Sequence, residues 1–488
     1  MPINLINHAW IPVLTKTGER KTIAPWQMAD ADLLRPDWPR PDLNLGCLEF
    51  LIGLIFLADP PEDSDDWEDR QDPDPERLSD RLRPFASAFE LTGDGPRFLQ
   101  DLEDLPGAPN TPDMLFIDSA GANTARNNAD LMVHRGRYPV LDPALAAMAL
   151  YTFQAHAPSG GAGNRTSMRG GGPMVTLIEP GQGLWPMIWA NVPDGMPGDP
   201  EALPWMQPTQ VSQDKGSERY PQQGIEAESF FGTPRRLRLV EDAGQITGVV
   251  QRPYGANYAG WVHPLTPYYR MKEGAELLPK HPKPGRFGYR NWLGVVVDGG
   301  EDALSQTGRS VALWHERSGW QQAHLIVAGW AMDNMKPLDF TWSEPPLLNL
   351  PDGGLALRGM IGAADLFCGS LRGALAPVMG AGEARQAVQE AFYDLTQAGF
   401  EQWAAELVAG RALQEVARDW VAELRRVSLR LFDDRAVPGL ADRPMEAQHR
   451  IARARAGLVA AFVGAKGNGA KAYELLGLEP AGKPEVTA

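Results

Sequence analysis

The sequence has few of the residues that build metal sites. Its 488 residues include two cysteines and eight histidines, and no two histidines lie three or four positions apart. This spacing excludes the paired ligands of an HExxH helix, and a structural zinc site would need distant histidines and carboxylates. Cys47 and Cys368 each lie in an apolar helical pattern and are expected to be buried free thiols. We therefore expect no metal and no other cofactor.

Motifs that bind nucleotides or hold a nucleophile are also missing. The chain has no GxxxxGK[ST] loop and no GxSxG elbow. The stretch GAGNRT at 161–166 begins like a dinucleotide fingerprint, but it lacks the third glycine and follows FQAHAPS rather than a strand. No nucleophile has a base beside it, so we expect that the chain is not an enzyme. A metal-dependent nuclease or hydrolase built on the many acidic residues stays open as an alternative.

Long uncharged apolar runs are absent as well. The first residues, MPINLINHAWIPVL, have neither the basic region nor the apolar core of a signal peptide, so we expect a soluble cytoplasmic protein without membrane contact. The net charge is −16, and the stretch from Asp59 to Asp80 alone carries −9 of it. An acidic run interrupted by prolines is typical of a solvated loop. The rest of the chain therefore has room for locally positive surface.

The first 355 residues predict a mixed α+β domain. They are rich in proline and glycine, and short β-type runs such as WIPVLT, MVTLIEP, RRLRLVED, LGVVVDG and AHLIVAGWAM are separated by long loops. One early segment, DLNLGCLEFLIGLIFLA, is apolar on all sides and predicts a buried helix. We expect a large N-terminal domain over residues 1–355 with several short antiparallel sheets.

Residues 356–488 have a different pattern. Proline becomes sparse, and apolar residues recur at spacings of three and four, which is typical of helices. One such face comprises Leu413, Val416, Trp420, Leu424, Val427 and Leu431. Similar faces in 388–395 and 451–462, with a helix over about 356–380, predict a C-terminal four-helix bundle.

The strongest candidate for a binding site is the glycine-rich loop HAPSGGAGNRTSMRGGGP at 156–173. Its glycines at 160, 161, 163, 170, 171 and 172 allow a partner to approach the backbone closely, and Arg165 and Arg169 add positive charge. This combination suits a groove or a phosphate backbone of nucleic acid. A flexible surface loop without a ligand is the alternative.

A second candidate is the segment HLIVAGWAMDNMKPLDFTW at 324–342. Its apolar alternation around a short Asp-Asn centre predicts a β-hairpin. Met332 and Met335 bracket the turn, and Lys336 follows. An exposed methionine at a hairpin tip can insert between base pairs as a wedge. The alternative is an ordinary hairpin whose methionines fold back onto the core.

Arginines form a third group. In TPRRLRL, Arg236 and Arg238 share one face of a strand, while Arg235 points the other way. Arg252 lies in a loop bounded by proline and glycine. A further stripe on one predicted helix, for which a solvated helix face is the ordinary explanation, consists of Arg411, Arg418 and Arg425.

These segments occur in an order that resembles the large subunit of the type I-E CRISPR Cascade surveillance complex, the CasA family. The resemblance rests on NLINHAWIPVLTKTGERKTIAP, PSGGAGNRTSMRGGGPMVT, FFGTPRRLRL, GWVHPLTPYY, AGWAMDNMK and the C-terminal helical region. It covers nearly the whole chain, and 60–110 and 180–225 match only loosely.

The resemblance implies a non-catalytic subunit in antiviral defence. Such subunits recognise the protospacer-adjacent motif (PAM) of double-stranded DNA from the minor groove, wedge the duplex open to start R-loop formation, and help to recruit a separate helicase-nuclease. The implied partners are double-stranded target DNA and the crRNA-bearing backbone, 5′-end-binding and small subunits. A purely architectural subunit that bridges its neighbours without touching DNA is a further alternative.

The resemblance also implies roles for residues of this sequence. The glycine loop that lies against the minor groove corresponds to Gly160, Gly161, Ala162 and Gly163, and Ala162 stands where the family pattern has glycine. A lysine that the family uses from a neighbouring loop falls on Arg252, which keeps the charge but changes the donor geometry.

The implied hairpin wedge consists of Asp333, Asn334 and Met335, with Lys336 beside it. Asp and Asn replace the Asn and Gln of a well-known form of the family, so the preferred motif is open. A loop that contacts the guide end or the backbone of the complex corresponds to 116–137. Its candidate contact residues are Phe116, Arg126, Arg135 and Arg137.

Overall fold

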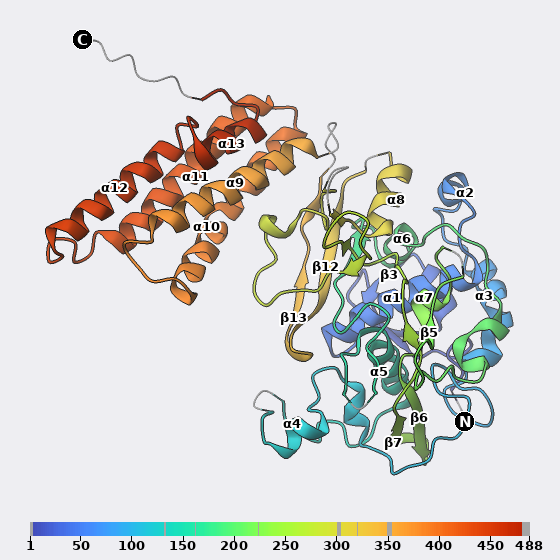
Figure 1. Cartoon of the computed structure of the whole chain (residues 1–488). Helices are drawn as coiled ribbons and strands as arrows, with labels where there is room; N and C mark the ends of the chain where they lie inside the picture. The colour runs from blue at the N-terminus through green and yellow to red at the C-terminus, as the bar shows by residue number, and fades with distance from the viewer. Residues whose placement is uncertain are drawn as a thin grey trace, which may run out of the picture. The chain divides into compact units, whose positions relative to one another are not determined.

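The chain folds into two compact units. The computed structural model describes residues 3–130, 133–161, 163–222, 224–299, 304–319, 321–348 and 354–480. Contacts between residues group Met1–Arg286 with Leu304–Pro346 as unit 1, and Phe287–Ala303 with Leu347–Ala488 as unit 2. Unit 1 mixes helices, small sheets and long loops, whereas unit 2 is helical (Figure 1). The α+β class predicted from the sequence is confirmed.

The core of unit 1 contains two adjacent helices, α1 (Pro41–Ala58) and α5 (Pro143–His156). A proline begins each helix, and the Asp142 carboxylate caps α5 by accepting a hydrogen bond from the Ala144 N–H at 2.9 Å. Every residue of α1 from 45 onward is buried, as its apolar sequence predicts. Among the described residues, α1 is the one helix long and apolar enough to cross a membrane, but 89% of it is buried inside the protein.

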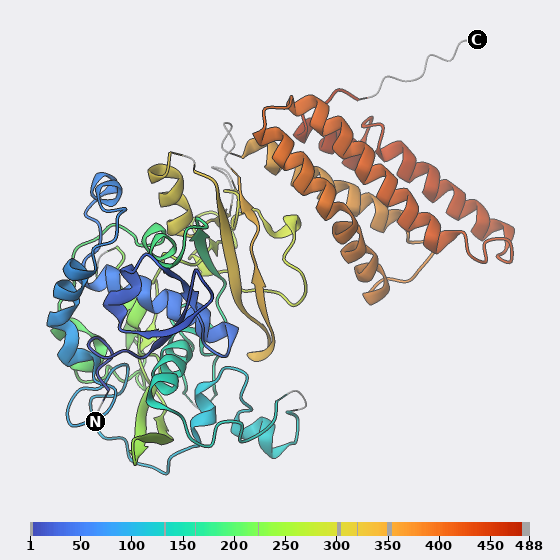
Figure 2. The same ribbon diagram turned by 180° about the vertical axis from the view of Figure 1, so that it is seen from behind.

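The largest sheet of unit 1 is centred on strand β12 (Ala323–Asp333). It pairs antiparallel with β4 (Val175–Glu179) through residues 324–328 and with β13 (Lys336–Ser343) through residues 327–333. Figure 2 shows β12 and β13 as one long hairpin. The separate hairpin of β6 (Arg236–Asp242) and β7 (Gln245–Arg252) is also antiparallel. The runs predicted as strands at these positions are confirmed.

The other elements of unit 1 are short. The remaining strands are β1 (Ile11–Thr15), β2 (Arg20–Ile23), β3 (Leu33–Pro36), β5 (Glu218–Arg219), β8 (Asn257–Tyr258), β9 (Tyr268–Tyr269), β10 (Leu278–Pro279) and β11 (Ser305–Gln306), with β14 (Pro346–Leu347) at the boundary between the units. The remaining α-helices are α2 (Ser64–Asp69), α3 (Pro75–Leu82), α4 (Ala122–Arg126), α6 (Leu184–Ala190), α7 (Glu228–Phe231) and α8 (Arg309–Arg317). The 3-10 helices are η1 (Pro25–Ala29), η2 (Arg83–Phe89), η3 (Pro112–Leu115), η4 (Pro200–Ala202) and η5 (Pro204–Met206), with η6 (Tyr289–Asn291) in unit 2.

The acidic stretch 59–80 differs from the solvated loop that its composition predicts. Much of it is helical and forms α2 and the first part of α3. Its first residue, Asp59, is buried and accepts ion pairs from Arg70 at 2.6 Å and Arg77 at 2.8 Å. Arg81 adds a longer contact of 3.5 Å. Three guanidinium groups thus compensate one buried carboxylate, and this pairing gives the segment a fixed structure despite its net charge.

Unit 2 contains four long helices, as the apolar periodicity predicts. They are α9 (Leu355–Ala374), α10 (Glu383–Val408), α11 (Leu413–Ala436) and α12 (Met445–Ala461), and they lie side by side in Figures 1 and 2. Trp420 of α11 is fully buried, and its Nε1 donates to the Met360 carbonyl of α9 at 3.0 Å. A short fifth helix, α13 (Gly467–Leu475), packs on α9 and was not predicted. Leu413, placed on the apolar face by its spacing, is instead 38% exposed because it begins its helix.

The segment Phe287–Ala303 belongs to unit 2 by its contacts. Tyr289 is fully buried and stacks on Phe400 with ring centroids 4.4 Å apart. Its hydroxyl is hydrogen-bonded to the Thr396 hydroxyl at 2.8 Å. The run LGVVVDG at 293–299, which predicts a strand, forms a turn in which Gly294 has a φ of 67°. Its valines are therefore buried through a reversal of the chain rather than in a sheet. The domain boundary near residue 355 stays a prediction.

Candidate nucleic-acid interface

The tip of the β12–β13 hairpin is a two-residue turn. Asp333 pairs with Lys336, and the residues between them, Asn334 and Met335, have φ values of 47° and 63°. Two successive left-handed residues define a type I′ turn, and the conformation costs a non-glycine residue such as Met335 about 1 kcal/mol. All four residues are exposed. The hairpin is thus present, with its turn one residue later than the predicted Asp-Asn centre.

The second half of the glycine-rich loop packs beneath this hairpin. A Cβ on Gly171 would lie 3.1 Å from the Met335 Sδ and 2.5 Å from the Pro158 Cα, and a Cβ on Gly172 would lie 2.8 Å from the Met332 Cε. These glycines are therefore needed for packing. Met332 folds back onto the loop, which is the alternative that the sequence left open. Met335 also lies over the loop, but it stays 46% exposed.

The first half of the loop forms a separate turn. The Asn164 N–H donates to the Gly161 carbonyl at 2.8 Å, and Gly163 has a φ of 81°. The Gly163 carbonyl accepts from the Tyr254 N–H at 2.9 Å, and a Cβ on Gly163 would lie 2.5 Å from the Tyr254 ring. A Cβ on Gly161, in contrast, would meet no atom of the described residues within 4 Å. Ala162 lies outside the described residues, so its predicted contact stays a prediction.

Arg165 connects the turn to a neighbouring segment. Its Nε donates to the Ser212 hydroxyl at 2.8 Å and its Nη2 donates to the Ser212 carbonyl at 2.6 Å. The Ser212 N–H in turn donates to the Tyr254 carbonyl at 3.0 Å. Arg252, two residues before Tyr254, is exposed, and no described residue pairs with its guanidinium. The structure thus places Arg252 beside the turn, with its charge unpaired, and uses Arg165 to hold the loop.

Arg169 lies in the interior rather than on the surface that the sequence predicts for it. It is 3% exposed, and its Nη1 lies 2.6 Å from the Glu49 Oε1. The His156 Nε2 lies 2.6 Å from the other oxygen of Glu49. Burial alone would raise the pKa of Glu49, but Arg169 and His156 outweigh it and hold that pKa below its usual range. A contact between Arg169 and DNA would require the loop to leave this ion pair.

Glu49 is a residue that the sequence analysis missed. It lies in α1 and is fully buried. A single charged residue within the apolar run from 45 to 58 was the available signal, because such a carboxylate needs a buried partner.

A basic segment beside the second half of the loop was also missed. The Lys280 backbone leads into His281, whose Nδ1 lies 3.0 Å from the Gly172 carbonyl. His281, Lys283 and Arg286 are exposed. The available signal was the run KHPKPGR at 280–286. It has four basic residues among seven, in a protein that is acidic as a whole. This segment adds positive charge next to the hairpin.

The predicted guide-contacting loop is largely closed on itself. Phe116 is 2% exposed and stacks on Tyr138 with ring centroids 4.0 Å apart. Arg137 donates two hydrogen bonds to the Asp118 carboxylate at 2.9 and 2.8 Å. Neither Phe116 nor Arg137 offers a free contact group in this conformation.

Two further residues of that loop are on its surface. Arg135 pairs with Asp130, and its guanidinium also donates to the Ala125 carbonyl at 2.8 Å. Arg126 is exposed at the end of α4. Of the four predicted residues, Arg126 is the one that presents a charge without a partner among the described residues, and the contact with the guide or the complex stays a prediction.

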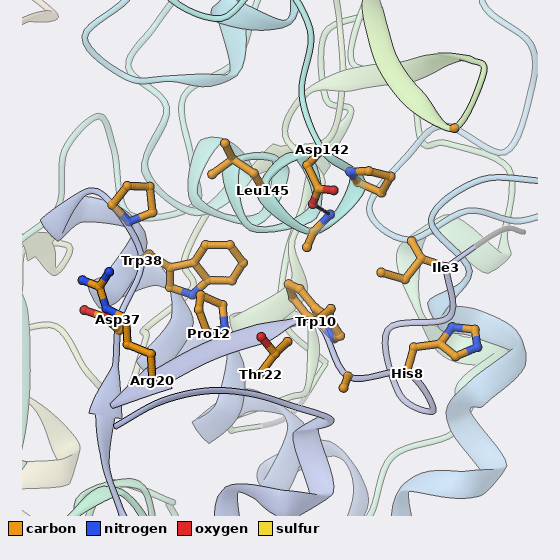
Figure 3. Close-up of a pocket in the computed structure, with 15 residues that line it drawn as sticks. Ile3, His8, Trp10, Pro12, Arg20, Thr22, Asp37, Trp38, Asp142 and Leu145 are labelled. Atoms are coloured by element: carbon orange, nitrogen blue, oxygen red, sulfur yellow. Dashed lines mark hydrogen bonds and ion pairs between the residues drawn. The ribbon is translucent and has the colours of Figure 1, made fainter. Parts of the chain in front are cut away.

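A separate cavity of about 890 Å³ lies near the start of the chain (Figure 3). Trp10 and Trp38 form part of its apolar lining, and Asp142 lies at the opposite side, where α5 begins. Arg20 and Asp37 form an ion pair of 2.6 Å next to it. None of the residues predicted to bind nucleic acid lines this cavity.

The described part of the chain contains no group of three or more His, Cys, Asp or Glu side chains that could hold a metal ion. Cys47 and Cys368 are buried and free, as predicted. Burial raises the pKa of each thiol to about 12.

Comparison with known proteins identifies a family and a fold. The model of the family "CRISPR-associated protein Cse1" matches residues 4–431. Thermus thermophilus CasA (Cse1) has a similar fold, with a TM-score of 0.71 and 18% identity over 97% of this chain and 99% of that chain. Thermobifida fusca Cse1 gives 0.70 and 19% over 99% of both chains. A chain of a CRISPR RNA-guided surveillance complex gives 0.68 and 15% over 94% of this chain and 99% of that chain.

Proposed function

The chain belongs to the CRISPR-associated protein Cse1 family, and from this premise we propose that it is the non-catalytic large subunit of a type I-E surveillance complex. In this role it recognises the PAM of double-stranded DNA from the minor groove, wedges the duplex open to start R-loop formation, and helps to recruit a helicase-nuclease. The observation that carries the proposal is that the glycine-rich loop, the hairpin tip and the segment of Arg252 are joined by direct contacts.

These contacts connect segments that lie far apart in the sequence. Met335 of the hairpin lies over Gly171, whose missing Cβ leaves room for Pro158. The outer turn of the loop begins at Gly160, two residues after Pro158. In this turn the Gly163 carbonyl accepts a hydrogen bond from the N–H of Tyr254, which lies two residues after Arg252. We call the exposed residues of this assembly the recognition surface. They are Gly160, Gly161, Arg252, Asp333, Asn334, Met335 and Lys336.

The chemistry of the recognition surface suits a minor groove. The open face of Gly161 lets backbone approach the groove floor, which a side chain would prevent. Arg252 and Lys336 are exposed cations that can bind phosphates on either side of the groove. Met335 is an exposed apolar group on a rigid turn, which is the kind of side chain that unstacks a base step.

Asp333 distinguishes this surface from a purely cationic one. Its carboxylate accepts a hydrogen bond from the Asn334 amide at 3.0 Å and stays exposed. In a minor groove, the guanine amino group is the one base donor, and a carboxylate can accept from it. We propose that Asp333 contributes to the choice of motif in this way.

The wedge is tested by the substitution Met335→Gly. Glycine adopts a positive φ without strain, so we expect the isolated chain to gain about 1 kcal/mol of stability. Opening of the first base pairs by the assembled complex should nevertheless fall, because the apolar tip is gone. A fluorescent base analogue beside the motif measures the opening. Met196→Ala, which shortens a methionine that is 73% exposed elsewhere, is the control. Unchanged opening by Met335→Gly contradicts the wedge.

The phosphate contact is tested by Arg252→Ala. Loss of one phosphate contact should weaken duplex binding and reduce the dependence of log K on log salt by about 0.9. Titration of the assembled complex with duplex at several salt concentrations measures both. Arg35→Ala removes an exposed arginine of β3 and should change neither. If both variants behave alike, Arg252 does not bind the duplex.

A further inference from the structure

Arg235 is a buried cation whose position none of the roles above explains. It directly precedes β6 and is 5% exposed. Its Nη1 lies 2.9 Å from the place that a Cβ on Gly160 would occupy, and its Nη2 donates to the Pro158 carbonyl. The guanidinium therefore lies directly beneath the exposed turn of the glycine-rich loop, and a side chain at Gly160 would press on it.

The charge of Arg235 has no carboxylate to compensate it among the described residues. The neighbouring arginines each have a carboxylate partner. Arg236 lies 2.6 Å from the Asp101 carboxylate, and Arg238 lies 3.0 Å from the Asp104 carboxylate. Arg235 instead has the ring of Phe153 5.2 Å from its Cζ. Its Nε is buried, and no described residue accepts a hydrogen bond from it. Buried charges are normally paired, so a single uncompensated guanidinium indicates a missing anion.

Burial lowers the pKa of Arg235 to about 10, so it stays protonated at neutral pH. The turn above it offers further donors. The N–H groups of Gly161 and Gly163 donate to no acceptor within the described residues. A cation and free backbone N–H groups around glycines form the arrangement that binds phosphate groups in proteins.

We propose that Arg235 and the turn of Gly160, Gly161 and Gly163 form a phosphate-binding site, and that its ligand is one backbone phosphodiester of the duplex. This inference rests on the proposed function, which brings a duplex to the same loop. A phosphodiester carries a single negative charge, which one guanidinium balances. Nη2 already donates to Pro158 and Nε is buried, so Nη1, which lies against Gly160, is the donor placed to contact the phosphate. Such a contact fixes how deeply the loop lies in the groove and reads no base.

The test uses the assembled complex with its guide RNA and a duplex that carries the recognised motif. Single phosphates around the motif are replaced by uncharged methylphosphonates, and duplex binding is measured for the wild type and for Arg235→Gln. We expect one phosphate whose neutralisation weakens wild-type binding about tenfold, the usual effect of a hydrogen bond to a charged group. In Arg235→Gln the same replacement should have almost no further effect.

Two additional variants keep the test clear. Arg236→Gln removes the adjacent arginine, which pairs with Asp101 and does not face the turn, so the tenfold effect should remain. If Arg235→Gln does not fold, Gly160→Ala places a methyl group against Nη1 and should reduce the effect at the same phosphate. Either variant then reports on the site without removing the whole loop.

The outcomes separate this inference from the proposed function. If binding by the wild type depends on the motif but the effects of Arg235→Gln and every methylphosphonate simply add, the phosphate site is overturned and the proposed function stands. If wild-type binding does not depend on the motif, the proposed function itself fails. If inorganic phosphate stabilises the wild type more than Arg235→Gln while the duplex series is additive, the site takes free phosphate, which overturns the assignment to DNA.

Discussion

The two halves of the glycine-rich loop have similar compositions but different surroundings. In the second half, Gly171 and Gly172 have protein atoms pressed against the positions where their side chains would be. In the first half, Gly160 and Gly163 are packed in the same way against Arg235 and Tyr254, but a Cβ on Gly161 would face open space among the described residues. Glycine therefore serves internal packing in both halves, and at Gly161 it leaves room for a partner. Composition alone does not separate these two uses.

The arginines of the loop differ in the same way. Arg169, in the second half, is buried against Glu49, whereas Arg165, in the first half, is half-buried and bonded to the neutral Ser212. The second half is thus an anchor held by a buried ion pair, and the first half is an outer turn held by ordinary hydrogen bonds. Two predictions test this difference, and a third concerns the buried charges around the anchor.

The largest effect is expected for Arg169→Met. The substitution leaves the carboxylate of Glu49 buried without its guanidinium, which typically costs 3–5 kcal/mol, about the upper range for single substitutions. Urea unfolding of the isolated chain measures it. Arg165→Met removes bonds to one serine and should cost about 1 kcal/mol. Equal losses for the two variants would contradict the division into anchor and outer turn.

A smaller loss of folding stability is expected when a glycine of either half is replaced by alanine. Gly172 has a φ of 63°, and a Cβ there would lie 2.5 Å from the Trp330 carbonyl oxygen, so Gly172→Ala should cost about 3 kcal/mol through backbone strain and overpacking. Gly161→Ala has the strain without the clash and should cost about 1 kcal/mol. It should instead weaken duplex binding by the assembled complex. Thermal unfolding and duplex titration give the two readouts, and a reversed order of the stability losses would contradict the geometry.

The smallest effect concerns pH. His263 is buried, and this burial, with the nearby charge of Arg169, holds its pKa well below the usual 6.5. The unfolded chain therefore binds a proton that the folded chain refuses, and stability falls as the pH drops below about 6.5. Between pH 7 and 5.5 the loss from this group should be about 1 kcal/mol.

Unfolding curves at both pH values measure the loss, and His263→Gln should reduce it. Protonation of the Glu49 carboxyl also lowers the stability as the pH falls, but at a lower pH than His263 does. Its folded pKa is lowered, so its contribution is complete above the unfolded value of about 4.3 and disappears only as the pH falls further. A drop of equal size in His263→Gln would show that another group is responsible.

Much of the fold could be predicted because its signals are local. The helix α1 follows from a long continuous apolar run, and the β12–β13 hairpin and the long helices of unit 2 follow from apolar periodicity. The signal was insufficient where a short segment depends on distant partners. LGVVVDG is a turn because its valines pack within unit 2, and the acidic stretch is ordered because three arginines reach Asp59.

The candidate site shows the same limit more sharply. The sequence identified the glycine-rich loop, the hairpin and Arg252, which are segments with unusual local composition. It did not show that Phe116 and Arg169 are buried, because that depends on Tyr138 and Glu49. It also passed over the basic segment around His281, whose relevance comes from its position against Gly172.

By itself, the sequence determined which elements form and which loops are rich in glycine and arginine, because backbone freedom, helical periodicity and charge are properties of the residues. Only the tertiary structure decided which of those glycines and arginines face outward. Arg169 meets a carboxylate from α1 and becomes an anchor, whereas Arg235 meets none among the described residues and keeps its charge beneath the open turn. The physical reason is that compensation of a charge depends on the groups within a few ångströms, and distant parts of the chain supply them.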